Sequence, residues 1–297
     1  MRQTLFALLC ALVFSYPAAG QSPTAPIVRY DALTHPEYGR FGMVSAQNRL
    51  SSEIGAKVLA EGGNAVDAAV AVGFSLAVTL PRAGNLGGGG FMLVHDAAND
   101  ETIAIDYREQ APRRATRDMY LDADGNVDRQ LSMFSHMAAG VPGTVAGFYL
   151  AHQEYGSLPG ERLLQPAIDL ARNGVVVSFD LATLLSRRQE RLCRDEAAWG
   201  YFYKDNGEPY RPGEILVQAD LANTLELIAK GGPDAFYTGP IADLIVAEME
   251  RGGGLVDAES LAAYKPAVRE PVRGTYRGYE VVSMPPPSSG GNHIVQM

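Results

Sequence analysis

Cysteine is scarce in this sequence, with only Cys10 and Cys193 among 297 residues. Cys10 lies in an N-terminal segment that we expect to be removed. Cys193 is then left alone, so neither an intrachain disulfide nor a cysteine-based metal site is possible. The 5 histidines include no pair at i and i+4 with a glutamate between them, a spacing typical of zinc sites. We therefore expect no bound metal and no cofactor.

Motifs for nucleotide binding and for serine hydrolysis are also missing, although glycine is concentrated at Gly84 and at positions 87–90. A phosphate-binding loop needs Gly-Lys followed by Ser or Thr, whereas Phe91 and Met92 follow here. The dinucleotide pattern Gly-x-Gly-x-x-Gly is absent, and so is a Gly-x-Ser-x-Gly nucleophile turn. The glycines are expected to form a tight connection from a helix to a strand, with a backbone that could also line a site.

No block of like charges dominates the chain. It has 25 lysine and arginine residues against 34 aspartate and glutamate residues, and a formal net charge of -9. This balance argues against nucleic acid or an anionic membrane surface as the partner. No segment after residue 20 is a candidate to span a membrane.

Residues 1–20 have the pattern of a secretory signal peptide. Arg2 supplies the positive start, residues 4–15 form an apolar run that is too short to cross a bilayer, and small residues at 18–20 suit cleavage. A buried N-terminal helix is the alternative, but burial would not explain these flanks. We expect the mature protein to be periplasmic or secreted.

After a poorly ordered, polar lead-in at 21–40, the chain is long enough for one large domain or two ordinary ones, and its alternating helical and strand segments indicate an α/β or α+β class. Asn64 and Asp67 have the spacing of a capping box, and the alanine- and valine-rich stretch 65–80 predicts a helix buried on all sides. The other predicted helices are 51–61 with Ser51 or Ser52 as its cap, 164–172, 181–192 with Ser178 as its cap, 218–229 and 240–250.

Strand patterns favour antiparallel pairing over a doubly wound parallel sheet. The predicted strands are 42–47, the hairpin pair 91–96 and 102–108, and the hairpin pair 272–276 and 279–283. Residues 293–297 look like the first turn of a further helix. Because a single turn is unstable alone, we expect the chain to be the front part of a longer protein.

Arg108 is the sharpest candidate for a functional residue. It follows an apolar strand pattern, and Asp106 and Glu109 lie beside it. A guanidinium offers a fixed fork of N–H donors that matches a carboxylate, such as that of an amino-acid substrate. The alternative is an ordinary ion pair at the end of a strand, which the residues alone favour. Ser288 and Ser289 present a similar choice between binding a ligand and turning the chain.

One protein family shares a series of motifs with this chain in the same order. The motifs are Asn64-Ala-Val-Asp-Ala-Ala69, Gly84-Asn-Leu-Gly-Gly-Gly-Gly-Phe-Met92, Asp106-Tyr-Arg-Glu109 with its continuation to Pro112, Val141-Pro-Gly143, Asp234-Ala-Phe-Tyr-Thr-Gly239, Tyr264 and Pro285-Pro-Pro-Ser-Ser-Gly-Gly291. Together they resemble the γ-glutamyltransferase family over residues 41–297. So many matches in one order are not expected by chance.

The resemblance implies a fold and a reaction. The fold is that of the N-terminal nucleophile hydrolases, an αββα sandwich of two antiparallel sheets between helical layers, and it is incomplete in this chain. The reaction begins with a proenzyme that cuts itself before a threonine. The threonine hydroxyl then attacks a γ-glutamyl amide such as glutathione and forms an acyl-enzyme. Water or an amino acid accepts the glutamyl group.

The resemblance also implies which residues bind the substrate. Only Arg108 maps onto this chain, as the arginine that binds the α-carboxylate of the γ-glutamyl group, and this reverses the preference for an ordinary ion pair. The nucleophile, the ligands of the α-amine and the oxyanion donors belong to the C-terminal, small-subunit part, which is the expected partner. The chain therefore holds no catalytic residue and is expected to be inactive alone.

Two other functions stay open. The same scaffold suits a related amidase, such as a β-lactam side-chain acylase or a transpeptidase acting on poly-glutamate, because a fold does not fix the substrate. A non-catalytic periplasmic binding protein is the other alternative, since the nucleophile is missing.

Overall fold

The computed structural model describes residues 38–297, of which 41–297 form one compact unit. The signal peptide predicted at 1–20 lies outside the described residues, and so does the lead-in predicted at 21–40 up to residue 37. None of the described helices is long and apolar enough to cross a membrane.

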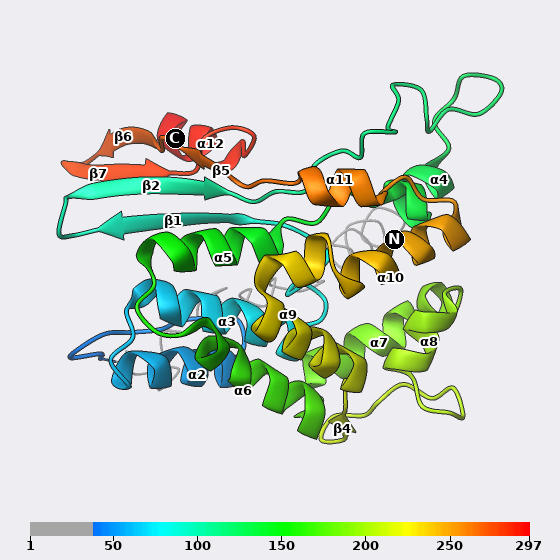
Figure 1. Cartoon of the computed structure of the whole chain (residues 1–297), viewed down its shortest axis with the longest axis horizontal. Coiled ribbons are helices and arrows are strands. Elements are labelled where there is room, and N and C mark those ends of the chain that lie inside the picture. Colours follow the sequence, from blue (N-terminus) through cyan, green and yellow to red (C-terminus); the bar gives the residue numbers. More distant parts are fainter. Residues whose placement is uncertain (1–37) are drawn as a thin grey trace, which may run out of the picture. The chain divides into compact units, whose positions relative to one another are not determined.

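Helices hold more of the compact unit than strands do (Figure 1). In the first half of the chain they are α2 (Arg49–Ala60), α3 (Ala65–Thr79), α4 (Arg129–Phe134), the 3₁₀ helix η1 (His136–Ala138), α5 (Thr144–Tyr155) and α6 (Gly160–Asn173). In the second half they are α7 (Phe179–Leu192), α8 (Glu196–Phe202), α9 (Ala219–Tyr237), α10 (Pro240–Gly252), α11 (Ala258–Ala263) and α12 (Gly290–Gln296).

All strand pairs in the described part of the chain are antiparallel. The strands are β1 (Phe91–Asp96), β2 (Glu101–Asp106), β3 (Val175–Val176), β4 (Ile215–Leu216), β5 (Ala267–Arg269), β6 (Val272–Tyr276) and β7 (Tyr279–Ser283). β1 and β2 form a hairpin, and β5 joins β2 from far along the chain, with Ala104 opposite Arg269. The prediction of an α+β fold with antiparallel sheets is confirmed.

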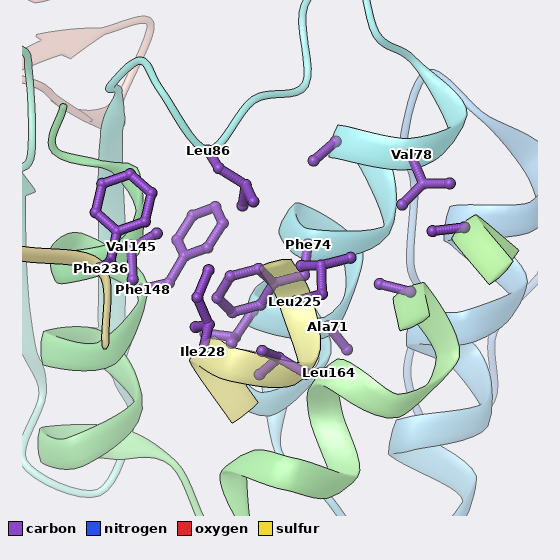
Figure 2. Close-up of a cluster of buried hydrophobic side chains, with 14 of the residues drawn as sticks. Ala71, Phe74, Val78, Leu86, Val145, Phe148, Leu164, Leu225, Ile228 and Phe236 are labelled. Atoms are coloured by element: carbon purple, nitrogen blue, oxygen red, sulfur yellow. The ribbon is translucent and has the colours of Figure 1, made fainter. Parts of the chain in front are cut away.

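Helix α3 lies at the centre of the hydrophobic core. Its N-terminus has the predicted capping box, in which Asn64 accepts from the Asp67 amide and Asp67 accepts from the Asn64 amide at 2.9 Å. The helix packs against α2, α5 and α6, which explains why almost every side of it is apolar. Figure 2 shows Phe74 of α3 facing Phe148 of α5, with the ring centroids 5.1 Å apart and the rings edge to face.

Helix α5 connects this core to the sheet, since it contacts both α3 and β2 (Figure 1). Val94 of β1 and Ile105 of β2 are buried in the same core cluster. Because side chains alternate along a strand, their neighbours in the sequence point to the opposite face. The end of β2 is therefore anchored on one side by the core, and this anchor fixes where the following residues emerge.

Three local predictions were wrong. Residues 42–47 form no strand, because no described strand pairs with them and a strand without a partner leaves its backbone groups unpaired. Asn48, rather than Ser51 or Ser52, caps α2 by accepting from the Leu50 amide, and the Ser51 hydroxyl is buried against that of Thr79 at 2.9 Å. Strand β2 ends at Asp106, two residues before the predicted end.

Other boundaries follow the local signals. Ser178 caps α7, the strands β6 and β7 have the predicted ends, and Gly253 stops α10 in the left-handed conformation at φ 71°. The helix predicted at 218–229 breaks at Gly232, where the backbone is non-helical (φ 63°), and a second helical segment of α9 runs on to Tyr237. The last helix, α12, begins at Gly290, three residues earlier than the turn predicted from His293.

Candidate functional site

Arg108 emerges at the surface directly after a buried anchor. The Tyr107 amide donates to Gly90 O at 3.1 Å, and the Gly90 amide donates to Tyr107 O at 3.2 Å, which extends the β1–β2 pairing past the end of β2. The Tyr107 ring is buried and meets Phe148 edge to face, and burial raises the pKa of its hydroxyl to about 12. The backbone before Arg108 is therefore held rigidly while its own side chain is exposed.

The glycine-rich segment packs against this backbone, as its predicted role in a tight helix-to-strand connection requires. A Cβ on Gly89 would lie 2.5 Å from Tyr107 O and 2.9 Å from Arg108 Cα. The carbonyl of Gly88 accepts from the amides of Gly143 and Thr144, at 2.7 and 3.1 Å, where α5 begins. None of the glycines from 84 to 90 has a positive φ, so at 84, 88, 89 and 90 glycine serves close approach and not an unusual conformation, whereas Gly87 has open space beside it.

A cluster of tyrosines supports the carbonyl side of Arg108. The Tyr264 hydroxyl donates to Arg108 O at 3.0 Å, and the Tyr264 ring stacks on Tyr237 with centroids 5.6 Å apart. Tyr237 in turn donates to Pro142 O at 2.9 Å. Burial raises the pKa of Tyr264 well above its usual range, so its hydroxyl remains a donor. Four separate sequence motifs thus meet around one backbone position.

The Arg108 guanidinium has no carboxylate partner within residues 38–297. Its one hydrogen bond is a long contact of 3.5 Å from Nη1 to Pro287 O. The neighbouring acid, Asp106, pairs instead with Arg269, whose Nε lies 2.8 Å from Asp106 Oδ2. Within the described residues, Arg108 therefore forms no ordinary ion pair with either neighbouring acid, Asp106 or Glu109, and Asp106 is already engaged by Arg269.

The Pro-Pro-Pro-Ser-Ser-Gly-Gly loop reaches the same place. The contact from Arg108 to Pro287 joins positions 179 residues apart. Within the loop, Ser288 Oγ accepts from the Gly290 amide at 3.2 Å, so its hydroxyl has a local role in turning the chain. The loop places main-chain groups beside Arg108 and leaves the guanidinium exposed at the surface.

Sequence reasoning missed Arg269. It follows Lys265 and Pro266 in a short segment with no recognisable strand pattern, and only the pairing of β5 with β2 brings it to Asp106. Tyr264 had been noticed only as part of a motif, without a role. Arg113, which lies five residues after Arg108, forms an exposed ion pair with Glu259. No group of three His, Cys, Asp or Glu side chains suited to a metal ion occurs among the residues that the structure describes.

Comparison with known proteins gives consistent results. Residues 51–297 match the family described as Gamma-glutamyltranspeptidase. The chain is 52% identical over 300 residues to a glutathione hydrolase proenzyme of Escherichia coli strain K12. This match covers 100% of this chain and 51% of that protein. It is 38% identical over 281 residues to an acylase ACY 1 proenzyme of Pseudomonas sp. strain SE83, covering 93% of this chain and 50% of that protein.

A solved structure agrees in fold. The crystal structure of Helicobacter pylori gamma-glutamyltranspeptidase superimposes with a TM-score of 0.86 at 47% sequence identity, over 88% of this chain and 75% of that chain. The chain spans about half the length of the curated relatives that it matches.

Proposed function

The chain belongs to the gamma-glutamyltranspeptidase family, and from this membership we propose that it is the large-subunit part of an enzyme that cleaves γ-glutamyl amides. The complete protein transfers the γ-glutamyl group to water or to an amino acid through a threonine acyl-enzyme. Glutathione is the proposed donor, since the similar protein of Escherichia coli is named a glutathione hydrolase proenzyme.

The partner of this chain is the small-subunit part of the same proenzyme. That part supplies the nucleophile, the ligands of the α-amine and the oxyanion donors. Exposed apolar side chains on the β6–β7 hairpin and on α12, such as Tyr279 and Ile294, support a covering partner at this end of the molecule. The signal pattern at 1–20 supports a mature protein in the periplasm or outside the cell.

The observation that carries the proposal is the unpaired guanidinium of Arg108. The guanidinium has no carboxylate partner in the described residues, and its backbone is fixed by Tyr107 and Tyr264. Its N–H groups are therefore available to donate to the carboxylate of a ligand. In the proposed complex it binds the α-carboxylate of the γ-glutamyl group. It positions the donor and takes no part in bond cleavage.

Substitution of Arg108 tests this role in the complete proenzyme. Arg108→Ala removes a charge-assisted pair worth about 1.5–3 kcal/mol, so the KM for a γ-glutamyl anilide should rise roughly 10- to 100-fold. Arg113→Ala is the matched control, because Arg113 lies five residues along in an exposed ion pair. An unchanged KM in Arg108→Ala, with self-cleavage intact, would exclude the proposed role.

A related acylase is the second candidate, favoured by the similarity to the Pseudomonas acylase. A glutaryl group carries the same terminal carboxylate as a γ-glutamyl group and lacks only the α-amine. Arg108 would therefore bind either group, and the choice between them rests with the small-subunit part. A clear preference for a glutaryl amide over a γ-glutamyl anilide in the same assay would favour this candidate.

A further inference from the structure

Asp106 and Arg108 are separated by one residue, and a buried carboxylate so close would ordinarily attract the guanidinium. Asp106 is only 8% exposed and accepts through both oxygens. Its Oδ1 accepts from the Arg108 amide at 3.1 Å, and its Oδ2 accepts from Arg269 Nε at 2.8 Å. The backbone of Arg108 is thus tied to Asp106, while its side chain is not.

The pairing of β5 with β2 fixes the position of Arg269. In the pairing of β5 with β2, Ala104 lies opposite Arg269 and Asp106 lies opposite Ala267. Asp106 and Arg269 are therefore diagonal neighbours on one face, a geometry within reach of a long side chain. Their separation of 163 positions in the sequence shows that this pair depends on the tertiary fold and not on local sequence.

We propose that Arg269 is a positioning residue for the γ-glutamyl donor, which acts by neutralising Asp106 and so keeps Arg108 available for the α-carboxylate. The inference rests on the proposed function of Arg108. Without the positive charge of Arg269, Asp106 would compete with the substrate carboxylate for Arg108 and would also repel it. The donor would bind more weakly, while the chemical step on the nucleophile would be little changed.

The first experiment compares charge variants of the complete enzyme. Arg269→Gln keeps hydrogen-bonding capacity but loses the charge, and its donor KM should rise about fivefold with kcat nearly constant. Arg269→Lys keeps the charge and should stay within about twofold of wild type. Arg172→Gln is the control, because Arg172 forms a solvent-accessible ion pair with Glu226 between α6 and α9.

The decisive variant removes both charges. Asp106→Asn retains Oδ1 as an acceptor for the Arg108 amide, so the double variant Asp106→Asn/Arg269→Gln should recover most of the donor affinity. A KM as high as that of Arg269→Gln alone would overturn the inference, because Arg269 would then act only by holding β5. If Arg269→Gln does not fold, the donor KM of the double variant is compared with that of Asp106→Asn alone. Equal KM values support neutralisation of Asp106 by Arg269. A higher KM in the double variant contradicts it.

A second substrate separates this inference from the proposed function. A γ-glutamyl donor whose α-carboxylate is converted to a carboxamide has no charge for Arg108 to bind. The ratio of kcat/KM for the natural donor to that for the carboxamide should fall sharply in Arg108→Ala and partly in Arg269→Gln. An unchanged ratio in Arg108→Ala would refute the role of Arg108 itself. A fall in Arg108→Ala with none in Arg269→Gln would refute only the role of Arg269.

Discussion

Asp67 shows how one residue can serve both a local motif and the tertiary fold. It is buried, yet each oxygen is satisfied: it accepts from the Asn64 amide at 2.9 Å, and from the Ser157 amide and hydroxyl at 3.0 and 2.6 Å. Burial alone raises the pKa of its carboxyl, but the hydrogen bonds from Ser157, Asn64 and Leu158 outweigh burial and hold the pKa below its usual value. The ionised form therefore joins the start of α3 to the turn before α6.

Removing this carboxylate should destabilise the protein. Asp67→Ala leaves several buried donors unpaired and should lower the free energy of unfolding by about 3 kcal/mol, whereas Asp67→Asn, which keeps one acceptor oxygen, should cost about half of that. Urea unfolding followed by circular dichroism gives both values. Asp243→Asn, at an exposed position on α10, is the control and should change little. Equal stability of Asp67→Ala and wild type would contradict this account.

At the scale of elements, α3 and α5 carry the sheet and so the candidate site. Phe74 of α3 is fully buried and meets Phe148 of α5, while Phe148 meets Tyr107, the residue before Arg108. These edge-to-face contacts form a continuous apolar path from the centre of the core to the end of β2, and Figure 2 shows its first part, from Phe74 to Phe148. Packing at α3 therefore supports the position of Arg108 indirectly.

A cavity at Phe74 tests the importance of this packing. Phe74→Ala should lower the free energy of unfolding by about 4 kcal/mol, since the interior is close-packed and relaxes only partly around a missing ring. The measurement is again urea unfolding. Phe179→Ala is the matched control, because Phe179 is 77% exposed. Similar losses in the two variants would argue against a core centred on α3.

At the scale of the whole molecule, Glu248 links stability to pH through one partner on its own helix and one from a distant segment. Glu248 of α10 accepts from Arg251 Nε at 2.8 Å and pairs with His136 of η1 at 2.6 Å, across 112 residues. The hydrogen bond from Arg251, followed by that from His136, lowers the pKa of Glu248 to about 2 from its ordinary 4.5. Because the folded pKa is depressed, this stabilisation is present above pH 4.5 and is lost as the pH falls towards 2.

Acid unfolding should reveal this contribution. In Glu248→Gln the side chain at position 248 no longer titrates. The melting temperature of this variant should therefore fall less steeply than that of wild type between about pH 5 and pH 2. Glu250→Gln, an exposed position on the same helix, should keep the wild-type slope. Parallel curves for Glu248→Gln and wild type would show that the pair does not contribute to stability in solution.

Predictions from local sequence were most reliable where both partners of an interaction lie close together in the sequence. The capping box at Asn64, the hairpins 91–106 and 272–283, and the cap at Ser178 all involve residues close in sequence. Predictions failed where a distant partner decides the outcome. Residues 42–47 have strand-like side chains but no described strand to pair with, and Ser51 hydrogen-bonds to Thr79 instead of capping its own helix.

The sequence by itself determined the family, the α+β class and the choice of Arg108 as a candidate, because motif order, periodicity and side-chain chemistry are local properties. The tertiary structure alone decided the state of that arginine. Whether Arg108 is paired depends on where Asp106 finds its counterion, and Arg269 reaches Asp106 only through the pairing of β5 with β2. Charges interact through space, so Arg269, which is far along the chain, determines whether Arg108 pairs with Asp106. The residues next to Arg108 in the sequence do not determine this.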